Sequence, residues 1–380
     1  MKICLVGPAY PYRGGISHFT QMLAREFQSA HEVRVVGFSR LYPSLLFPGR
    51  TQYDEGGALV RVESLRLIDS INPMTFARAA RAVVEFAPSL VVVQWWHPFF
   101  APAYRALVRA VKRRSSAPVV YLCHNVLPHE GSRIDRALAR WGLTVADAFL
   151  VQSVEDQARI ERLVPGAVVT LRPHPTYTQF AAGAMAPSQA RARLGVDGRV
   201  MLFFGLVRAY KGLDVLLEAF ARVAQKLQAT LLVVGEFYED RERYDRAIAT
   251  LSIGDRVRVV DRYVPDDEVG VYFSAADLVV LPYKSATSSG IAQTAFAFER
   301  PVIVTAVGGL PDVVHDGVTG YVVPPEDPAA LAAAMERFFA LDDAARMAAA
   351  IRSEAPRFAW GTFAQALVEL GERVRRSRGG

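Results

Sequence analysis

The sequence is poor in cysteine, and its few cysteines match no metal or redox motif. Among 380 residues there are two, Cys4 and Cys123, and both lie in apolar runs typical of buried strands. Two isolated thiols exclude a disulfide-stabilised scaffold, a CxxC redox pair and a cysteine-based zinc site. We therefore expect both to be reduced core residues of a cytosolic protein.

Long apolar runs and strongly basic clusters are also missing. No uninterrupted apolar stretch approaches the roughly 18–20 residues that span a bilayer, so any membrane association should be peripheral. The run from Met1 to Gly7 is too short for the apolar core of a signal peptide and is typical of a first strand. The net charge of +6 is modest, and no run of basic residues interleaved with aromatics predicts a nucleic-acid groove. Anionic small molecules or an anionic membrane surface are the better expected partners.

What the chain does contain is a regular alternation of strand and helix signals. Hydrophobic residues make up 51% and charged residues 22%, as in well-packed globular proteins, and 380 residues suit two domains. Apolar runs without period-2 alternation indicate strands covered on both faces, as in parallel sheets. We expect such strands at Lys2–Gly7, Glu32–Phe38, Leu90–Trp95, Pro118–Asn125, Ala148–Gln152, Val168–Leu171, Val200–Gly205, Thr230–Gly235, Val257–Val260, Asp277–Leu281 and Pro301–Thr305. The pattern predicts two doubly wound, Rossmann-like α/β domains that face each other across a cleft.

The predicted domain limits follow from this alternation. The first domain covers residues 1–178 and the second covers residues 179–355. The remaining residues, 356–380, form a helical segment that contains Trp360.

Two cations follow the first strand of the second half. Arg208 and Lys211 lie between that strand and a helix whose apolar residues begin at Leu213. In open α/β sheets such loops lie at the carboxyl edge of the strands, where ligands bind and the next helix presents its positive N-terminus. Arg208 and Lys211 are therefore candidate ligands of a diphosphate. The alternative is that both are solvated surface cations.

The first half offers two further candidates. Gly14 and Gly15 lie in the first turn, where glycines let backbone amides approach an anion, although a tight turn without a ligand is an equal alternative. His124 stands where a buried strand leaves the sheet. A histidine there is available to a substrate as a hydrogen-bonding or acid–base group, whereas a histidine inside the strand would be a core residue.

Aromatic and basic residues of the first half form a further candidate surface, where an acceptor molecule could bind. Trp95, Trp96 and His97 end the third strand and are candidates for a pocket wall. The next helix carries a basic face between Arg105 and Arg113, and the loop Leu45–Phe47 is unusually apolar. A solvated helix face and core packing are the ordinary explanations. Contact with a membrane or an apolar acceptor is the alternative.

Several motifs stand along the chain in a fixed order. They are the Gly14-Gly15 loop, His124 after a strand, Arg208 with Lys211-Gly212, Val234-Gly235, Asp277–Pro282, Pro301–Ile303, Gly308–Pro311, Gly317–Gly320 and Val322–Pro325. In this order they resemble retaining glycosyltransferases of the GT-B type, specifically the family 4 group that uses nucleotide sugars. The resemblance covers nearly the whole chain.

The resemblance implies a role for each matching residue. Arg208 and Lys211 would bind the donor diphosphate, Gly14 and Gly15 would offer amides to a phosphate or the sugar, and His124 would hydrogen-bond that sugar. Such enzymes need no metal or further cofactor, and their C-terminal helix crosses back to the first domain. The implied acceptor is a glycan or lipid-linked molecule of the cell envelope, reached from the cytoplasm at the inner membrane face.

The chain departs from the family pattern in its donor loop. The family has two glutamates separated by seven residues, but Ala286 and Thr294 stand at those positions. The donor-binding candidates that remain are Gly235, Ser288, Ser289, Gly290, Gln293 and Thr294. We expect an active transferase with an atypical donor loop. A non-catalytic nucleotide-sugar-binding protein and a sugar-nucleotide epimerase of the same fold are the alternatives.

Overall fold

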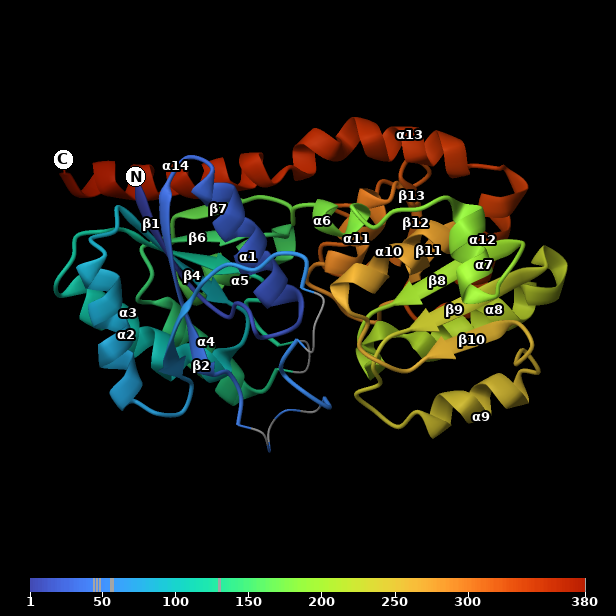
Figure 1. Ribbon diagram of the computed structural model, residues 1–380, viewed down its shortest axis with the longest axis horizontal. Coiled ribbons are helices and arrows are strands. Elements are labelled where there is room, and N and C mark those ends of the chain that lie inside the picture. The colour runs from blue at the N-terminus through green and yellow to red at the C-terminus, as the bar shows by residue number, and fades with distance from the viewer. Residues whose placement is uncertain (44, 46, 48, 55–57, 129–130, 380) are drawn as a thin grey trace. The chain divides into compact units, whose positions relative to one another are not determined.

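The computed structural model describes residues 1–43, 45, 47, 49–54, 58–128 and 131–379. The chain forms two compact units, each with its own parallel sheet (Figure 1). Unit 1 comprises Met1–Asp54, Val60–Pro173 and the chain from Ala359 onward, and unit 2 comprises His174–Phe358 with a short segment that ends at Leu59. The prediction of two doubly wound α/β domains is confirmed.

Unit 1 is built on a seven-stranded sheet in the order β3-β2-β1-β4-β5-β6-β7. The strands are β1 (Lys2–Val6), β2 (Glu32–Arg40), β3 (Leu65–Asp69), β4 (Leu90–Trp95), β5 (Val119–Cys123), β6 (Ala148–Val151) and β7 (Val169–Leu171). The helices are α1 (Gly15–Gln28), α2 (Met74–Glu85), the 3-10 turn η2 (Pro98–Phe100), α3 (Ala101–Lys112), α4 (Arg133–Leu143), α5 (Val154–Leu163) and α14 (Trp360–Gly379).

Burial explains why the central strands of unit 1 are almost entirely apolar. Every residue of β4 and β5 is buried, because helices cover both faces of the sheet. Helix α14 packs against α1 and over β5 and β6, and α2, α3 and α4 pack along one another (Figure 1). Cys4 and Cys123 are buried free thiols, and burial raises the pKa of Cys4 to about 12.

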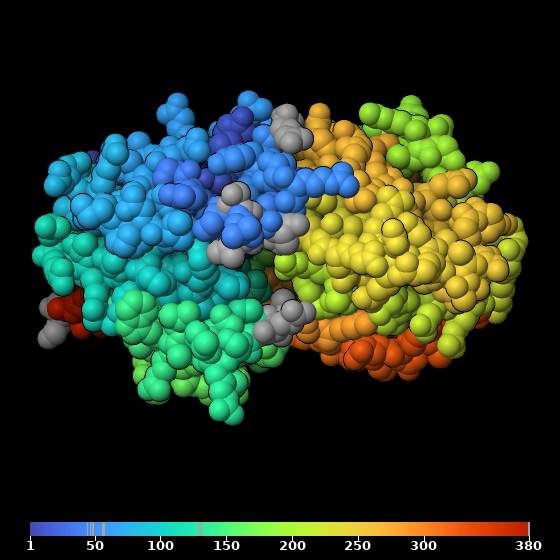
Figure 2. All heavy atoms as spheres, turned by 90° about the horizontal axis from the view of Figure 1, so that it is seen from below, coloured from blue at the N-terminus to red at the C-terminus, as the bar shows by residue number. Residues whose placement is uncertain are grey.

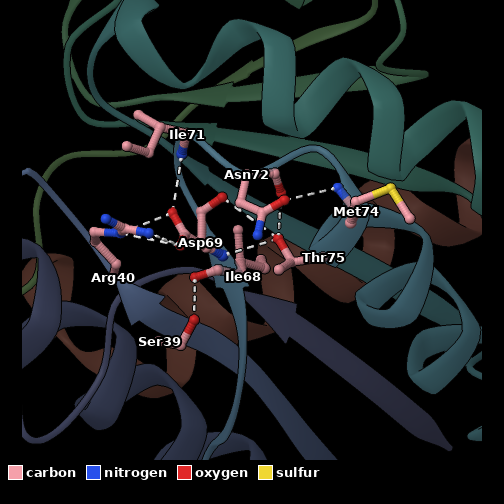
Figure 3. A network of polar contacts seen from close by, with 8 residues as sticks. All are labelled: Ser39, Arg40, Ile68, Asp69, Ile71, Asn72, Met74 and Thr75. Atoms are coloured by element: carbon pink, nitrogen blue, oxygen red, sulfur yellow. Dashed lines mark hydrogen bonds and ion pairs between the residues drawn. The ribbon is translucent and has the colours of Figure 1, made fainter.

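The sequence did not predict the edge strand β3. Its pairing with β2 is irregular, with register shifts around Phe38, and a polar network reinforces it (Figure 3). The guanidinium of Arg40 donates to both carboxylate oxygens of Asp69, and Ser39 Oγ donates to the carbonyl of Ile68 over 3.2 Å. Polar side chains hold part of this edge strand in place. Its sequence is therefore not the unbroken apolar run by which the inner strands are recognised.

Unit 2 is built on a six-stranded parallel sheet in the order β10-β9-β8-β11-β12-β13. The strands are β8 (Arg199–Phe204), β9 (Ala229–Val234), β10 (Val257–Val260), β11 (Leu278–Leu281), β12 (Val302–Thr305) and β13 (Gly320–Val323), the last of which was not predicted. The helices are α6 (Thr178–Ala181), α7 (Pro187–Leu194), η3 (Ala209–Lys211), α8 (Leu213–Leu227), α9 (Glu242–Thr250), α10 (Asp266–Ala275), α11 (Gly290–Ala297), α12 (Pro328–Ala340), α13 (Ala344–Glu354) and η4 (Ala355–Phe358).

Helices pack in two groups in unit 2. Helix α8 contacts α9 and α12, whereas α10 contacts α6 and α7. The inner strands β8, β9, β11 and β12 are almost wholly buried between these groups. Within the described part of the chain, no helix is long and apolar enough to cross a bilayer.

Candidate functional site

The carboxyl edge of the unit 2 sheet brings three loops into close contact. A Cβ atom at Gly235 would lie 2.0 Å from the carbonyl oxygen of Gly205, and one at Gly212 would lie 2.0 Å from the carbonyl oxygen of Pro282. Both glycines have positive φ angles, 147° at Gly235 and 68° at Gly212. Only glycine suits both conditions, so the loops after β8, β9 and β11 meet backbone to backbone.

Lys211 is a fixed cation at this edge. Its Nζ donates to the hydroxyl of Tyr283 over 3.1 Å and lies 4.7 Å from the centroid of that ring. Burial disfavours the ammonium ion, but the neighbouring phenols of Tyr283 and Tyr210 outweigh this effect, and the pKa of Lys211 is raised. Lys211 is therefore protonated at neutral pH, with its charge held beside the ring of Tyr283.

Tyr283 also connects Lys211 to the start of α11. The Tyr283 hydroxyl lies 3.5 Å from Ser289 Oγ, and that Oγ accepts a hydrogen bond of 3.3 Å from the amide of Ala292. Ser289 is thus the N-cap of α11, which begins at Gly290. A helix N-terminus favours anions, and here it lies beside the half-buried Lys211. The two features together offer positive charge and free helix amides, the groups that suit a phosphate or diphosphate.

Arg208 stands on the same loop but is exposed. Its backbone is extended, with φ −141° and ψ 153°, because the preceding Val207 forms a β-bridge with Phe237. The guanidinium carbon lies 5.4 Å from the ring centroid of Tyr238, and the charge of Arg208 is near enough to lower the pKa of Lys211. The structure therefore brings together Arg208, Lys211, Gly235, Ser289 and Gly290 in unit 2.

The other donor-loop candidates lie deeper. Gln293 is fully buried, and its side-chain oxygen accepts a hydrogen bond of 2.9 Å from Thr176. Thr294 donates to the carbonyl of Gly290 in its own helix over 2.9 Å. Ala286 is buried, and Ser288 is half-buried. Both predicted polar side chains of α11 thus already have partners within unit 2.

In unit 1, His124 is enclosed by two glutamines. The imidazole Nε2 lies 2.5 Å from Gln94 Oε1, and Nδ1 lies 3.4 Å from Gln152 Nε2. The side chain is 4% exposed, and Phe19 of α1 packs its edge on the ring at 4.6 Å between centroids. The histidine that the strand-end position singled out is thus a nearly buried, hydrogen-bonded group.

Gly14 and Gly15 form the start of α1 in the same unit. Gly14 is the N-cap residue with φ 101°, a conformation that L side chains rarely adopt. Among the described atoms, none lies within 4 Å of a Cβ built at either glycine. The turn therefore leaves open space beside its backbone, as an anion-binding loop requires.

The aromatic candidates of unit 1 have structural partners. Trp95 is fully buried, stacks on Tyr121 and donates from Nε1 to the carbonyl of Val126. Trp96 Nε1 donates to the hydroxyl of Tyr42 over 3.0 Å, and His97 Nδ1 accepts from the amide of Phe99 over 3.1 Å. Trp95 is a core residue, while Trp96 and His97 are half-buried.

The basic face of α3 is partly neutralised within unit 1. Lys112 pairs with the carboxylate of Asp147, and Arg105 lies 4.9 Å from the ring of Trp141 on α4. The chain around α3 and α4 forms part of the surface in Figure 2, drawn in cyan to green. In the apolar loop Leu45 is exposed, Phe47 is half-buried, and Leu46 lies outside the described residues.

Sequence reasoning missed three residues that shape these sites. Gln94 and Gln152 stand at the carboxyl ends of predicted strands of unit 1, and Tyr283 lies two residues beyond a predicted strand of unit 2. The available signal was a polar group at or just after the end of an apolar run. The loop with His124 begins at the same edge of the unit 1 sheet, and the loop with Lys211 begins at the same edge of the unit 2 sheet.

Comparisons with known proteins agree with this fold. A family model described as Glycosyl transferases group 1 matches residues 198–340, and one described as Glycosyl transferase 4-like domain matches residues 14–175. The chain belongs to the GT-B glycosyltransferases of family 4.

Similar proteins include two described as D-inositol 3-phosphate glycosyltransferases. The one from Catenulispora acidiphila is 32% identical over 63% of this chain and 62% of its own length. The one from Streptomyces scabiei is 32% identical over 59% of this chain and 53% of its own length. The chain thus spans between about half and two thirds of the length of these curated relatives.

Solved structures share the fold. The sucrose-phosphate synthase of Thermosynechococcus elongatus has a TM-score of 0.76 at 21% identity, covering 99% of this chain and 100% of that one. Anabaena Alr3699/HepE in complex with UDP has a TM-score of 0.71 at 18% identity and covers 100% of both chains.

Proposed function

We propose that the protein transfers a sugar from a nucleotide-sugar donor to a hydroxyl acceptor with retention of configuration. The observation that carries this proposal is the placement of Lys211, Tyr283 and Ser289 at the N-terminus of α11. A protonated lysine beside a helix N-terminus fits the diphosphate of such a donor. Membership of the family supports the reaction class.

The same groups would stabilise the transition state. As the glycosidic bond breaks, negative charge develops on the departing nucleoside diphosphate. Lys211, Arg208 and the N-terminus of α11 would neutralise that charge without reorganising, which is where fixed charges are most effective. The acceptor would attack from the face that the diphosphate leaves, with a phosphate oxygen taking the acceptor proton. His124 would hydrogen-bond the transferred sugar.

The similar proteins suggest which substrates to try first. The curated relatives are described as acting on D-inositol 3-phosphate, and one structural neighbour is a complex with UDP. We therefore propose a UDP sugar as donor and a polyol phosphate such as D-inositol 3-phosphate as acceptor. A glycan or lipid-linked acceptor in cell-envelope synthesis is the next choice.

The test is a transfer assay with purified protein. UDP-, GDP-, ADP- and dTDP-sugars are each incubated with D-inositol 3-phosphate, and the nucleoside diphosphate and the glycosylated product are measured by mass spectrometry. One donor should give acceptor-dependent product whose anomeric configuration, determined by NMR, matches the donor. Product of inverted configuration would contradict retention, and an absence of transfer to any acceptor tried would contradict the transferase proposal.

One observation favours a second function, nucleotide-sugar binding without transfer. Ala286 and Thr294 replace the two family glutamates, and Thr294 donates to the carbonyl of Gly290 in its own helix. Donor binding without transfer or hydrolysis would favour this second function. Conversion of the donor to an epimer without any acceptor would instead favour an epimerase.

A further inference from the structure

Four neighbouring strands of unit 1 end at one small polar cluster. In the sheet order β1, β4, β5 and β6 are adjacent, and Gly7, Gln94, His124 and Gln152 stand at or just beyond their carboxyl ends. The backbone fixes the position of His124 at the end of β5, because its amide donates to the carbonyl of Trp95 in β4 over 2.8 Å. The cluster is thus set by the sheet itself and not by a loop.

The contacts of the two amides match only one form of the imidazole. Gln94 presents its oxygen to Nε2, and an amide oxygen can only accept. Gln152 presents its nitrogen to Nδ1, and an amide nitrogen can only donate. A neutral imidazole has one donor and one acceptor nitrogen, whereas an imidazolium has two donors. The arrangement therefore fits a neutral ring with its proton on Nε2.

Burial and packing make this arrangement specific. Gln94 is fully buried and Gln152 is 2% exposed, so bulk water does not compete for these contacts. Phe19 covers the imidazole at 4.6 Å, and Trp360 of α14 packs on Phe19 at 4.8 Å between centroids. Phe19 thus packs against the ring of His124, and the side-chain amides of Gln94 and Gln152 contact its two nitrogens.

Gly7 leaves room for this cluster. A Cβ atom at Gly7 would lie 2.5 Å from Cγ of Gln94 and 2.8 Å from its Cβ. Both are near-backbone atoms of a side chain confined in the sheet, so they have little freedom to move away. The glycine that opens the first turn is therefore required for the position of Gln94.

We propose that Gln94 and Gln152 are positioning residues that hold His124 as the neutral imidazole with its proton on Nε2. His124 then serves the reaction as a fixed hydrogen-bonding group and not as a proton shuttle. The contact at Nδ1 is the longer of the two, so a sugar hydroxyl that reaches His124 would donate to Nδ1 in place of Gln152. The inference rests on the proposed function only for the step that involves the sugar.

The first test needs no substrate. The protein is labelled with ¹⁵N in histidine, and long-range ¹H–¹⁵N spectra at neutral pH are assigned with His124→Asn. The wild type should show one protonated nitrogen, Nε2, and one unprotonated nitrogen, Nδ1. Gln94→Glu should give a ring protonated at both nitrogens, because a carboxylate at Nε2 stabilises the imidazolium. Gln189→Glu, the same change on the exposed surface of α7, should leave the spectrum unchanged.

The second test uses turnover. Gln94→Met removes the acceptor at Nε2, and we expect kcat to fall about tenfold or more with little change in the donor KM. Gly7→Ala displaces Gln94 without altering it. Like Gln94→Met, it should give a mixture of the two neutral tautomers of His124 in place of one. If Gln94→Met does not fold, Gln152→Met tests the tautomer in the same ¹⁵N spectra, because it removes the donor at Nδ1.

The outcomes separate this inference from the function itself. A proton on Nδ1, or both nitrogens protonated in the wild type, would overturn the inference whatever the activity. Full kcat in Gln94→Met with a mixed tautomer would overturn the positioning role. A correct tautomer in a protein that transfers no sugar would contradict the proposed function and leave the assignment of the tautomer intact.

Discussion

The ammonium group of Lys211 lies 3.1 Å from the phenolic oxygen of Tyr283 and 4.7 Å from the centroid of its ring. Tyr283 is 2% exposed, so this contact is largely shielded from solvent. The two residues come from loops that follow β8 and β11, which are neighbours in the sheet. The lysine is thus placed before any ligand arrives, and a bound phosphate gains from a cation that is already ordered.

Replacement of Tyr283 by phenylalanine tests this placement. The ring and its contact with the ammonium stay, whereas the hydrogen bond to Lys211 and the contact of the hydroxyl with Ser289 are lost. We expect the affinity for a nucleoside diphosphate to fall by about 0.5–1.5 kcal/mol, the usual contribution of one hydrogen bond. Isothermal titration calorimetry measures the effect. Tyr321→Phe is the control, because its hydroxyl donates to Asp343 and not to a group of this site, and its affinity should stay near that of the wild type.

Gly235→Ala tests the backbone contact between the loops after β8 and β9. The added Cβ would lie 2.0 Å from the carbonyl oxygen of Gly205, at φ 147°. We expect a loss of at least about 1–3 kcal/mol in the free energy of unfolding, because both strain and a clash arise. Gly254→Ala is the matched control, since its nearest neighbour would be Ile248 at 3.8 Å. Equal stability of the two variants in urea unfolding would show that the loops do not meet in this way.

Asp156 gives unit 1 a pH-dependent stability. The side chain is fully buried on α5, and burial raises its pKa to about 7 despite the ion pair with Arg159 at 3.2 Å. A carboxyl group whose pKa is raised on folding favours the native state while it is protonated. The contribution is therefore complete below about pH 4 and is lost as the pH rises to about 7.

Asp156→Asn removes this titration. The wild type should lose on the order of 2–4 kcal/mol between pH 4 and pH 8, since one pKa unit corresponds to about 1.4 kcal/mol, and the variant should lose much less. Denaturant unfolding at several pH values measures both curves. Asp197→Asn, an exposed position, should retain the slope of the wild type. Parallel curves for wild type and Asp156→Asn would mean that Asp156 does not titrate in this range.

Asp147 connects α14 to the sheet of unit 1. Its carboxylate accepts from the amide of Val119 over 2.8 Å and pairs with Lys112 and with Arg378 of α14. Asp147→Ala should cost about 1–3 kcal/mol of unfolding free energy, because a charge-assisted bond to a buried amide is lost. Asp245→Ala breaks only the half-exposed pair with Arg241, which should be worth about 0–1 kcal/mol. A similar cost for both would contradict the role of Asp147.

The sequence predicted most of the fold because the inner strands are buried on both faces. A run such as Leu90–Trp95 is apolar except for Gln94, so its position and its parallel pairing follow from composition. The strand β3 carries Arg66 and an exposed Leu65 at the sheet edge, and β13 begins with a glycine. Neither has the apolar continuity that marks an inner strand.

The site was less predictable because its contacts join distant parts of the chain. Lys211 was found from its place before a helix, but its partner Tyr283 lies 72 residues later. Gln293 looked available to a donor, yet it bonds to Thr176, which lies 117 residues earlier. Polar side chains that follow a strand can face a ligand or the core, and local spacing does not distinguish the two.

The most direct test of the proposed site is a thermal-shift titration with UDP, GDP, ADP and dTDP and their sugars. Wild type, Lys211→Ala and Lys226→Ala are compared, the last being a control on α8 whose side chain is 67% exposed. A ligand of the native state raises the unfolding temperature by mass action. We predict a shift with one nucleotide class that Lys226→Ala keeps and Lys211→Ala loses, corresponding to about 1.5–3 kcal/mol of binding. An equal shift in Lys211→Ala would contradict the assignment of the diphosphate site.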